Sequence, residues 1–145
     1  MNAEAGVLTK EYAKIAMDFG WAVAFRNFAR AYETLTPRYQ QTVSKKQLER
    51  SIVDLLGTNS IDFVLPVSSF DTHDDFQPGD AGAVCMELRG HQVSVLCIAK
   101  VCHHNGPYRI REVAWSTPSF ESGDADFKKL FHECVTATVG PDRKK

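Results

Sequence analysis

The sequence predicts an α+β fold in which N-terminal helices pack on a curved, cone-like antiparallel sheet. Between positions 9 and 56, apolar residues recur every three or four positions, as on one face of a helix. From position 61 the period changes to two, and turn signals separate the apolar runs that follow. Because strands that follow a block of helices pair with one another, these runs are expected to form an antiparallel meander.

The length and charge of the chain limit the classes of protein to which it can belong. Its 145 residues fit one domain, expected to be ordered over about 9–136, with a disordered tail at 140–145. The formal net charge of −1 argues against a nucleic-acid binder, which normally carries a basic face. The regional bias is acidic, since residues 58–107 hold six Asp and Glu against two Lys and Arg. No apolar run reaches membrane-spanning length and no signal-peptide pattern is visible, so a cytoplasmic protein is predicted, with a trimmed leader left open.

The first helical segment is expected over residues 9–35. Thr9 is a candidate N-cap, and Gly20 marks a bend or a break. Thr36-Pro37 is expected to end this segment, because the residue before a proline is pushed out of the α region.

The second helix has clearer boundaries. Ser44 and Gln47 have the spacing of a capping box, in which each side chain bonds a backbone N–H of the first turn. Gly57 follows the last apolar position and suits the positive φ that commonly ends a helix.

The expected strands are 61–67, 82–88, 92–101 and 108–115. Pro66 lacks a backbone donor, so the first strand is expected at an edge or with a bulge. The third strand is apolar on both faces and is therefore expected to be central. Asn105-Gly106 is the strongest hairpin signal, and an amphipathic helix is expected at 122–136.

The cysteines are interpreted as free, buried thiols in a reducing compartment. The four are Cys85, Cys97, Cys102 and Cys134, and none forms a CxxC pair. A disulfide such as Cys85–Cys97 across a hairpin and metal ligation remain as alternatives.

A family resemblance lies in three segments, Ala31 to Leu35, Ser44 to Leu48 and Tyr108 to Val113, and covers about residues 10–116. These segments resemble the nuclear-transport-factor-2-like superfamily. This resemblance implies a cystatin-like cone fold. That fold hosts enzymes, binding domains, transport adaptors and bacterial immunity proteins, so it does not fix a function. The chain departs from the pattern in leaving little room for a third helix before the first strand.

The strongest binding candidate is the polar loop at 68–80. Its charged residues are Asp71, His73, Asp74, Asp75 and Asp80. The first interpretation is a solvated acidic loop. As a partner-binding loop it would attract a basic surface, whereas a metal site would lack the glycine and glutamate of an EF-hand. Arg109 and Arg111 are expected on one strand face with Trp115, which would be exposed for a partner.

The catalytic hypothesis is an acid–base pair inside the cone. A carboxylate or imidazole base opposite a tyrosine donor is the arrangement implied by isomerase- and dehydratase-like members of the superfamily. The weak candidates are Asp62, Tyr39, His91 and Tyr108. His103-His104 is interpreted as a polar hairpin tip, with metal ligation as the alternative.

The leading functional hypothesis is therefore a non-catalytic, cofactor-free protein-binding module. An immunity-type protein of bacterial origin or an adaptor would fit, as would a homodimer formed through the sheet. The alternative is a small-molecule carrier or enzyme, which requires a deep apolar cavity between the helices and the sheet.

Overall fold

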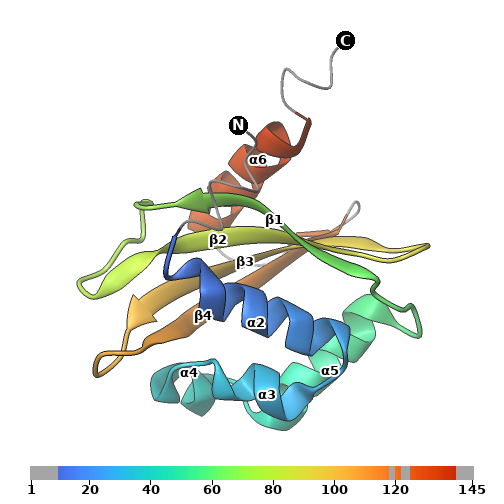
Figure 1. The fold of residues 1–145 in the computed structure, drawn as a ribbon, viewed down its shortest axis with the longest axis horizontal. Coiled ribbons are helices and arrows are strands. Elements are labelled where there is room, and N and C mark those ends of the chain that lie inside the picture. The colour runs from blue at the N-terminus through green and yellow to red at the C-terminus, as the bar shows by residue number, and fades with distance from the viewer. Residues whose placement is uncertain (1–9, 118–119, 122–124, 140–145) are drawn as a thin grey trace.

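The computed structural model describes residues 10–117, 120–121 and 125–139 (Figure 1). The helices that precede the sheet are α2 (Ala13–Ala24), α3 (Phe28–Glu33), α4 (Pro37–Thr42) and α5 (Lys45–Leu56). The strands are β1 (Phe63–Phe70), β2 (Asp80–Arg89), β3 (Ser94–His103), β4 (Tyr108–Thr117) and β5 (Phe120–Glu121), followed by α6 (Ala125–Val139). Helices followed by an antiparallel sheet confirm the predicted α+β class. None of the described helices combines the length and apolarity needed to cross a membrane.

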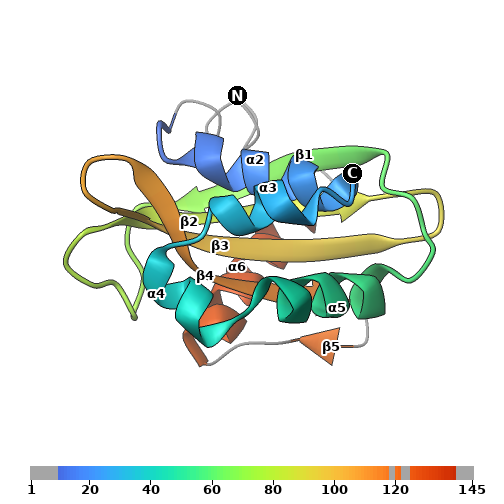
Figure 2. The same cartoon turned by 90° about the horizontal axis from the view of Figure 1, so that it is seen from below.

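The sheet is a simple meander with the order β1-β2-β3-β4-β5, and neighbouring strands are antiparallel. Figure 2 shows α2 to α5 in front of the strands, whereas α6 lies on the other side of the sheet. Two cores result, one on each face. Cys97, Ala99 and Val101 of β3 belong to the core under α2 to α5, and Ile98 belongs to the core under α6. The predicted central position of this strand is confirmed.

The helical segment predicted at 9–35 is broken at a different place. α2 continues through Gly20 and ends at Ala24, and the chain turns at Arg26, whose φ is +60°. The Asn27 side chain then accepts a hydrogen bond from the Arg30 N–H and so begins α3. Thr9 lies outside the described residues, as do position 122 and the tail at 140–145.

Gly20 is needed for close packing rather than for a bend. A Cβ at this position would lie 2.6 Å from Met86 Sδ and 2.8 Å from Val64 Cγ1, both on the sheet beneath α2. The absence of a side chain lets the helix approach β1 and β2 closely.

A helix missed by the sequence interpretation follows immediately. Thr36 caps α4 through a hydrogen bond from the Tyr39 N–H, and Pro37 occupies the first turn. Proline ends the segment before it, as predicted, but its fixed φ also suits the first position of a new helix. The capping box of Ser44 and Gln47 is confirmed, and Gly57 has a φ of +59°.

Edge and turn predictions are confirmed in the sheet. β1 is an edge strand with a register shift between Pro66 and Ser68. Asn105 and Gly106 both have positive φ in the β3–β4 hairpin. In β1, Val64 faces the helices, whereas Phe63 is 57% exposed.

Gly20→Ala should destabilise the protein although alanine is the better helix former. Forcing a methyl group against Met86 and Val64 should lower the free energy of unfolding by about 1–3 kcal/mol. Urea denaturation checks this, with Ser51→Ala on the exposed face of α5 as the control. An unchanged or increased stability of the Gly20 variant would contradict the packing role.

Candidate functional site

A buried ionic network centres on Lys100 of β3, whose side chain is 0% exposed. Its Nζ lies 2.8 Å from Asp126 Oδ2 at the start of α6 and 3.0 Å from Asp75 Oδ2 in the β1–β2 loop. Glu112 Oε1 on β4 is 3.7 Å away, and Nζ stands 4.0 Å from the ring centroid of Phe127. A single buried cation thus connects a loop, a helix and two strands.

Arg111 extends this network towards the start of β2. Its Nε donates to Asp80 Oδ1 at 2.7 Å and its Nη2 to Asp80 Oδ2 at 2.8 Å, which is a bidentate pair. Nη2 also donates to the Asp75 carbonyl at 3.0 Å. His73 Nδ1 lies 3.0 Å from Asp126 Oδ2 in the same cluster, with the imidazole almost fully buried.

The network is arranged to keep its groups charged. The hydrogen bond from Lys100 lowers the pKa of Asp75. Burial works against ionisation of Asp126, but its contacts with Lys100 outweigh burial and lower the pKa of this carboxyl. Burial likewise opposes the charge on Lys100, while hydrogen bonds to Asp126 and Asp75 raise the pKa of the amine. The opposite charges of this cluster therefore compensate one another inside the fold.

The interpretation of residues 68–80 as a solvated acidic loop is therefore wrong for its inner residues. The side chains of His73 and Asp80 are each 1% exposed, and Asp75 is paired with Lys100. Asp71 and Asp74 do face solvent, where they pair with Lys10 and Lys129 respectively. The loop folds onto the sheet because the buried cations draw its carboxylates inward.

The predicted shared face of Arg109, Arg111 and Trp115 is also wrong. Lys100 pairs with Glu112 and Val101 with Ile110, so Arg111 is an extra residue that interrupts the alternation. Arg111 enters the ionic network, and Arg109 donates to the Glu33 carbonyl. Trp115 packs in the helix-side core with its ring centroid 5.9 Å from that of Phe19, so it is not an exposed partner contact.

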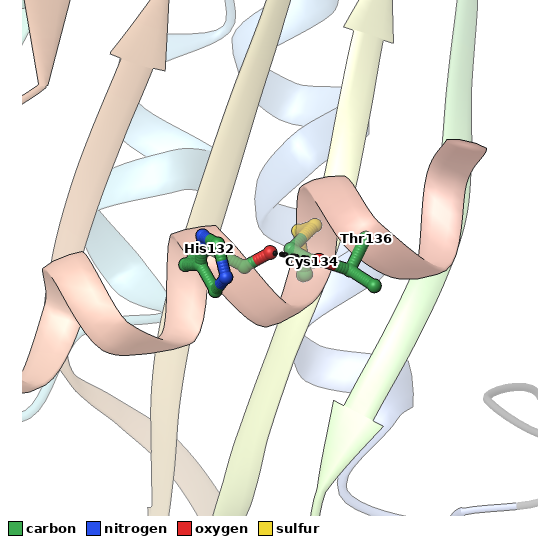
Figure 3. Close-up of a disulfide and its surroundings, with 4 residues drawn as sticks. His132, Cys134 and Thr136 are labelled. Atoms are coloured by element: carbon green, nitrogen blue, oxygen red, sulfur yellow. Dashed lines mark hydrogen bonds between the residues drawn. A yellow bond between two sulfur atoms is a disulfide. The ribbon is translucent and has the colours of Figure 1, made fainter. Parts of the chain in front are cut away.

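The cysteine interpretation needs a correction as well. Cys85 of β2 and Cys134 of α6 form a disulfide on the outer face of the sheet, which is the face covered by α6 (Figure 3). In the same close-up, the Thr136 hydroxyl donates to the His132 carbonyl within α6. Cys97 and Cys102 are free, and burial raises the pKa of both thiols, so neither is poised as a nucleophile.

The four catalytic candidates are not assembled into one site. Asp62 and His91 are exposed next to the β2–β3 end of the sheet. The Tyr39 hydroxyl bonds the backbone N–H and carbonyl of Val113, and Tyr108 stacks against His103 with centroids 4.5 Å apart. Side chains such as those of Phe19 and Met86 fill the space between helices and sheet, where the enzyme hypothesis needs a cavity. Among the described residues, no cluster of three or more His, Cys, Asp or Glu is suited to a metal ion.

An exposed apolar surface occurs where α2 ends beside the end of α5 (Figure 1). We call it the aromatic corner and define it as Trp21, Phe25, Phe28 and Val53. Phe25 is 72% exposed and stacks on Trp21 with centroids 5.7 Å apart. Phe25, Phe28 and Val53 line an open groove of about 630 Å³.

The backbone of the aromatic corner is held in place by Arg26. Its guanidinium donates to the carbonyl of Gly57 at 3.0 Å and to that of Asn59 at 2.9 Å. These bonds satisfy carbonyls just after α5, and they fix the unusual positive φ that turns Phe25 outward. The sequence signal for this surface is weak, because Phe25 continues the helical spacing of the buried residues.

Comparison with known proteins adds no relative: no protein-family model, curated protein or solved structure matches the chain. The resemblance to the nuclear-transport-factor-2-like superfamily therefore stays a prediction.

Lys100→Met should destabilise the protein strongly, because it removes the lysine partner of Asp126 and leaves Asp75 with Arg111 as its remaining cation. The expected loss is about 3–5 kcal/mol in the free energy of unfolding, measured by urea denaturation. Lys129→Met is the matched control, since Lys129 pairs with Asp74 in solvent and its removal should have no measurable effect. Equal effects of the two changes would show that the network does not support the fold.

Proposed function

We propose that this chain is a non-catalytic protein-binding module that docks its partner on the aromatic corner. The observation that carries this proposal is the exposure of Phe25 and its stacked neighbour Trp21 on a backbone fixed by Arg26. Clustered aromatic side chains on a rigid surface are typical of the residues that dominate binding energy in protein interfaces. An immunity-type inhibitor and an adaptor would both act through such a surface.

The expected partner presents apolar side chains surrounded by acidic ones. The helical layer at 10–57, which contains the aromatic corner, has eight Lys and Arg against five Asp and Glu. Opposite charge at the rim speeds association and selects the partner. The acidic loop is a poorer docking surface, because Lys100 and Arg111 already neutralise Asp75 and Asp80.

Homodimerisation through the sheet is not part of this proposal. α2 to α5 pack on one face of the sheet, and α6 packs across the other against residues from β1, β2, β3 and β4. Pairing of two such faces would require α6 to leave a core that contains Phe127, Leu130 and Phe131.

Phe25→Ser should weaken partner binding strongly without unfolding the protein, because the Phe25 side chain is 72% exposed. The expected weakening corresponds to about 2 kcal/mol or more, the range of an interface hot spot. The measurement is titration calorimetry with a purified partner obtained by affinity capture on the wild-type chain. Val135→Ser removes another exposed apolar side chain, 45% accessible, from α6 and should leave binding unchanged.

Two outcomes would count against docking at the aromatic corner. One is a captured partner that binds the Phe25 and Val135 variants with equal affinity. The other is concentration-dependent self-association of the wild-type chain that Phe25→Ser removes, because the corner would then serve a second copy of this chain.

We further propose that the protein works in an oxidising compartment. The cytoplasmic location predicted from the sequence is untested, and the Cys85–Cys134 disulfide favours the opposite, since such bonds persist mainly in oxidising environments. The bond joins β2 to α6 across 49 positions, so it restricts the unfolded chain and holds α6 on the sheet.

Differential alkylation of the protein from its native source tests this location. After denaturation, Cys97 and Cys102 should react before reduction, whereas Cys85 and Cys134 should react only after it. Mass spectrometry of the labelled peptides distinguishes the two pairs. Labelling of all four thiols in the first step would place the protein in a reducing compartment.

A further inference from the structure

Two adjoining clefts lie at the end of the molecule formed by α4 and the β3–β4 hairpin. The first has a volume of about 450 Å³ and contains Arg38 and His103 in its wall. The second has a volume of about 550 Å³ and is lined by Arg30 and Arg109. His104 belongs to both walls, so the two clefts adjoin at this residue, and we call them together the double cleft. Volumes of this size are typical of sites for small ligands.

The charges that line the two clefts differ in whether they are already neutralised. Arg111 and Glu112 line the first cleft; Arg111 is paired with Asp80, and Glu112 faces Lys100 and Arg111. Arg30 lies 3.7 Å from Asp18. These groups line the double cleft, but their charges are already compensated by neighbouring side chains and are of little use to a charged ligand.

Arg38 and Arg109 are different, because no carboxylate of the described residues lies within salt-bridge distance of either. Arg109 donates to a backbone carbonyl, that of Glu33, which leaves its positive charge uncompensated. Arg38 is exposed, and its guanidinium has no hydrogen-bond or ion-pair partner among the described side chains. Glu33 is the acidic residue in the second cleft. Two guanidinium groups without a carboxylate partner therefore line the double cleft: Arg38 is in the wall of the first cleft, Arg109 is in the wall of the second, and His104 is common to both.

The backbone that carries these groups is held in place by the fold. The segment between α3 and α4 is bonded to β4 through Ile110 N–H to the Thr34 carbonyl and Thr36 N–H to the Ile110 carbonyl, both at 2.8 Å. The His103 ring stacks on Tyr108 in the hairpin. A ligand would therefore lose little free energy to the ordering of the backbone around it.

From this arrangement we infer that the double cleft binds a small polyanion, either a di- or tricarboxylate or a phosphate ester. One anionic group contacts Arg38 and a second contacts Arg109, with His104 between them. Arginine suits both chemistries, because its planar guanidinium can bond two oxygens of a carboxylate or phosphate at once. This site is separate from the aromatic corner and does not depend on the proposed partner.

The inference is tested by titration calorimetry with citrate, succinate and inorganic phosphate, at an ionic strength held constant with sodium chloride. Wild-type protein should bind at least one of these anions with one site per chain. Arg38→Gln and Arg109→Gln should each weaken that binding about tenfold or more, as expected for loss of a charge-assisted hydrogen bond. Comparison of the carboxylates with phosphate tells which kind of anion the cleft prefers.

Arg50→Gln is the matched control, because Arg50 is an exposed arginine of α5 outside both clefts. The inference is overturned if no anion binds, or if Arg50→Gln weakens binding as much as the cleft variants do. Phe25→Ser should leave anion binding unchanged, and the two cleft variants should leave partner binding unchanged. Failure of one proposal is thereby distinguishable from failure of the other.

Discussion

The fold depends on the neutralisation of Lys100 inside the sheet. An ammonium group buried without partners would cost far more free energy than a domain of this size can spare. Its partners come from the β1–β2 loop, from β4 and from the first turn of α6. The loop and the helix each supply a carboxylate within 3.0 Å of the ammonium, so the packing of both elements is tied to the same buried charge.

This constraint decides which surfaces remain for function. With α6 held by Asp126 at one end and by the Cys134 disulfide further along, the outer face of the sheet is covered. The inner face is filled by the core of α2 to α5. The candidate surfaces therefore lie at the ends of the helical layer: the aromatic corner where α2 meets the end of α5, and the double cleft beside α4.

Local signals predicted the parts of the fold that depend on a few neighbouring residues. The capping box of Ser44 and Gln47, the hairpin at Asn105-Gly106 and the edge position of Pro66 each follow from backbone chemistry within four residues. The turn at Arg26 could not be predicted in this way, because its positive φ is maintained by carbonyls some thirty positions further along. The pairing of Cys85 with Cys134 likewise depends on where α6 packs, which spacing does not reveal.

The candidate site was harder to predict, because no sequence motif marks its residues. Their roles depend on which face of a strand each side chain occupies. Strict alternation would place Arg111 on the same strand face as Val113 and Trp115. The extra residue in β4 breaks this alternation, and Arg111 enters the ionic network instead. The useful signal was the lysine within the apolar run Leu96 to Cys102, since a central strand has no solvent-exposed face for it. A buried lysine requires carboxylates, and the acidic loop that follows β1 supplies one of them. Acidic residues of this loop that suggested a partner surface are therefore paired with buried cations inside the fold. For this reason we look for the partner surface on the helices instead.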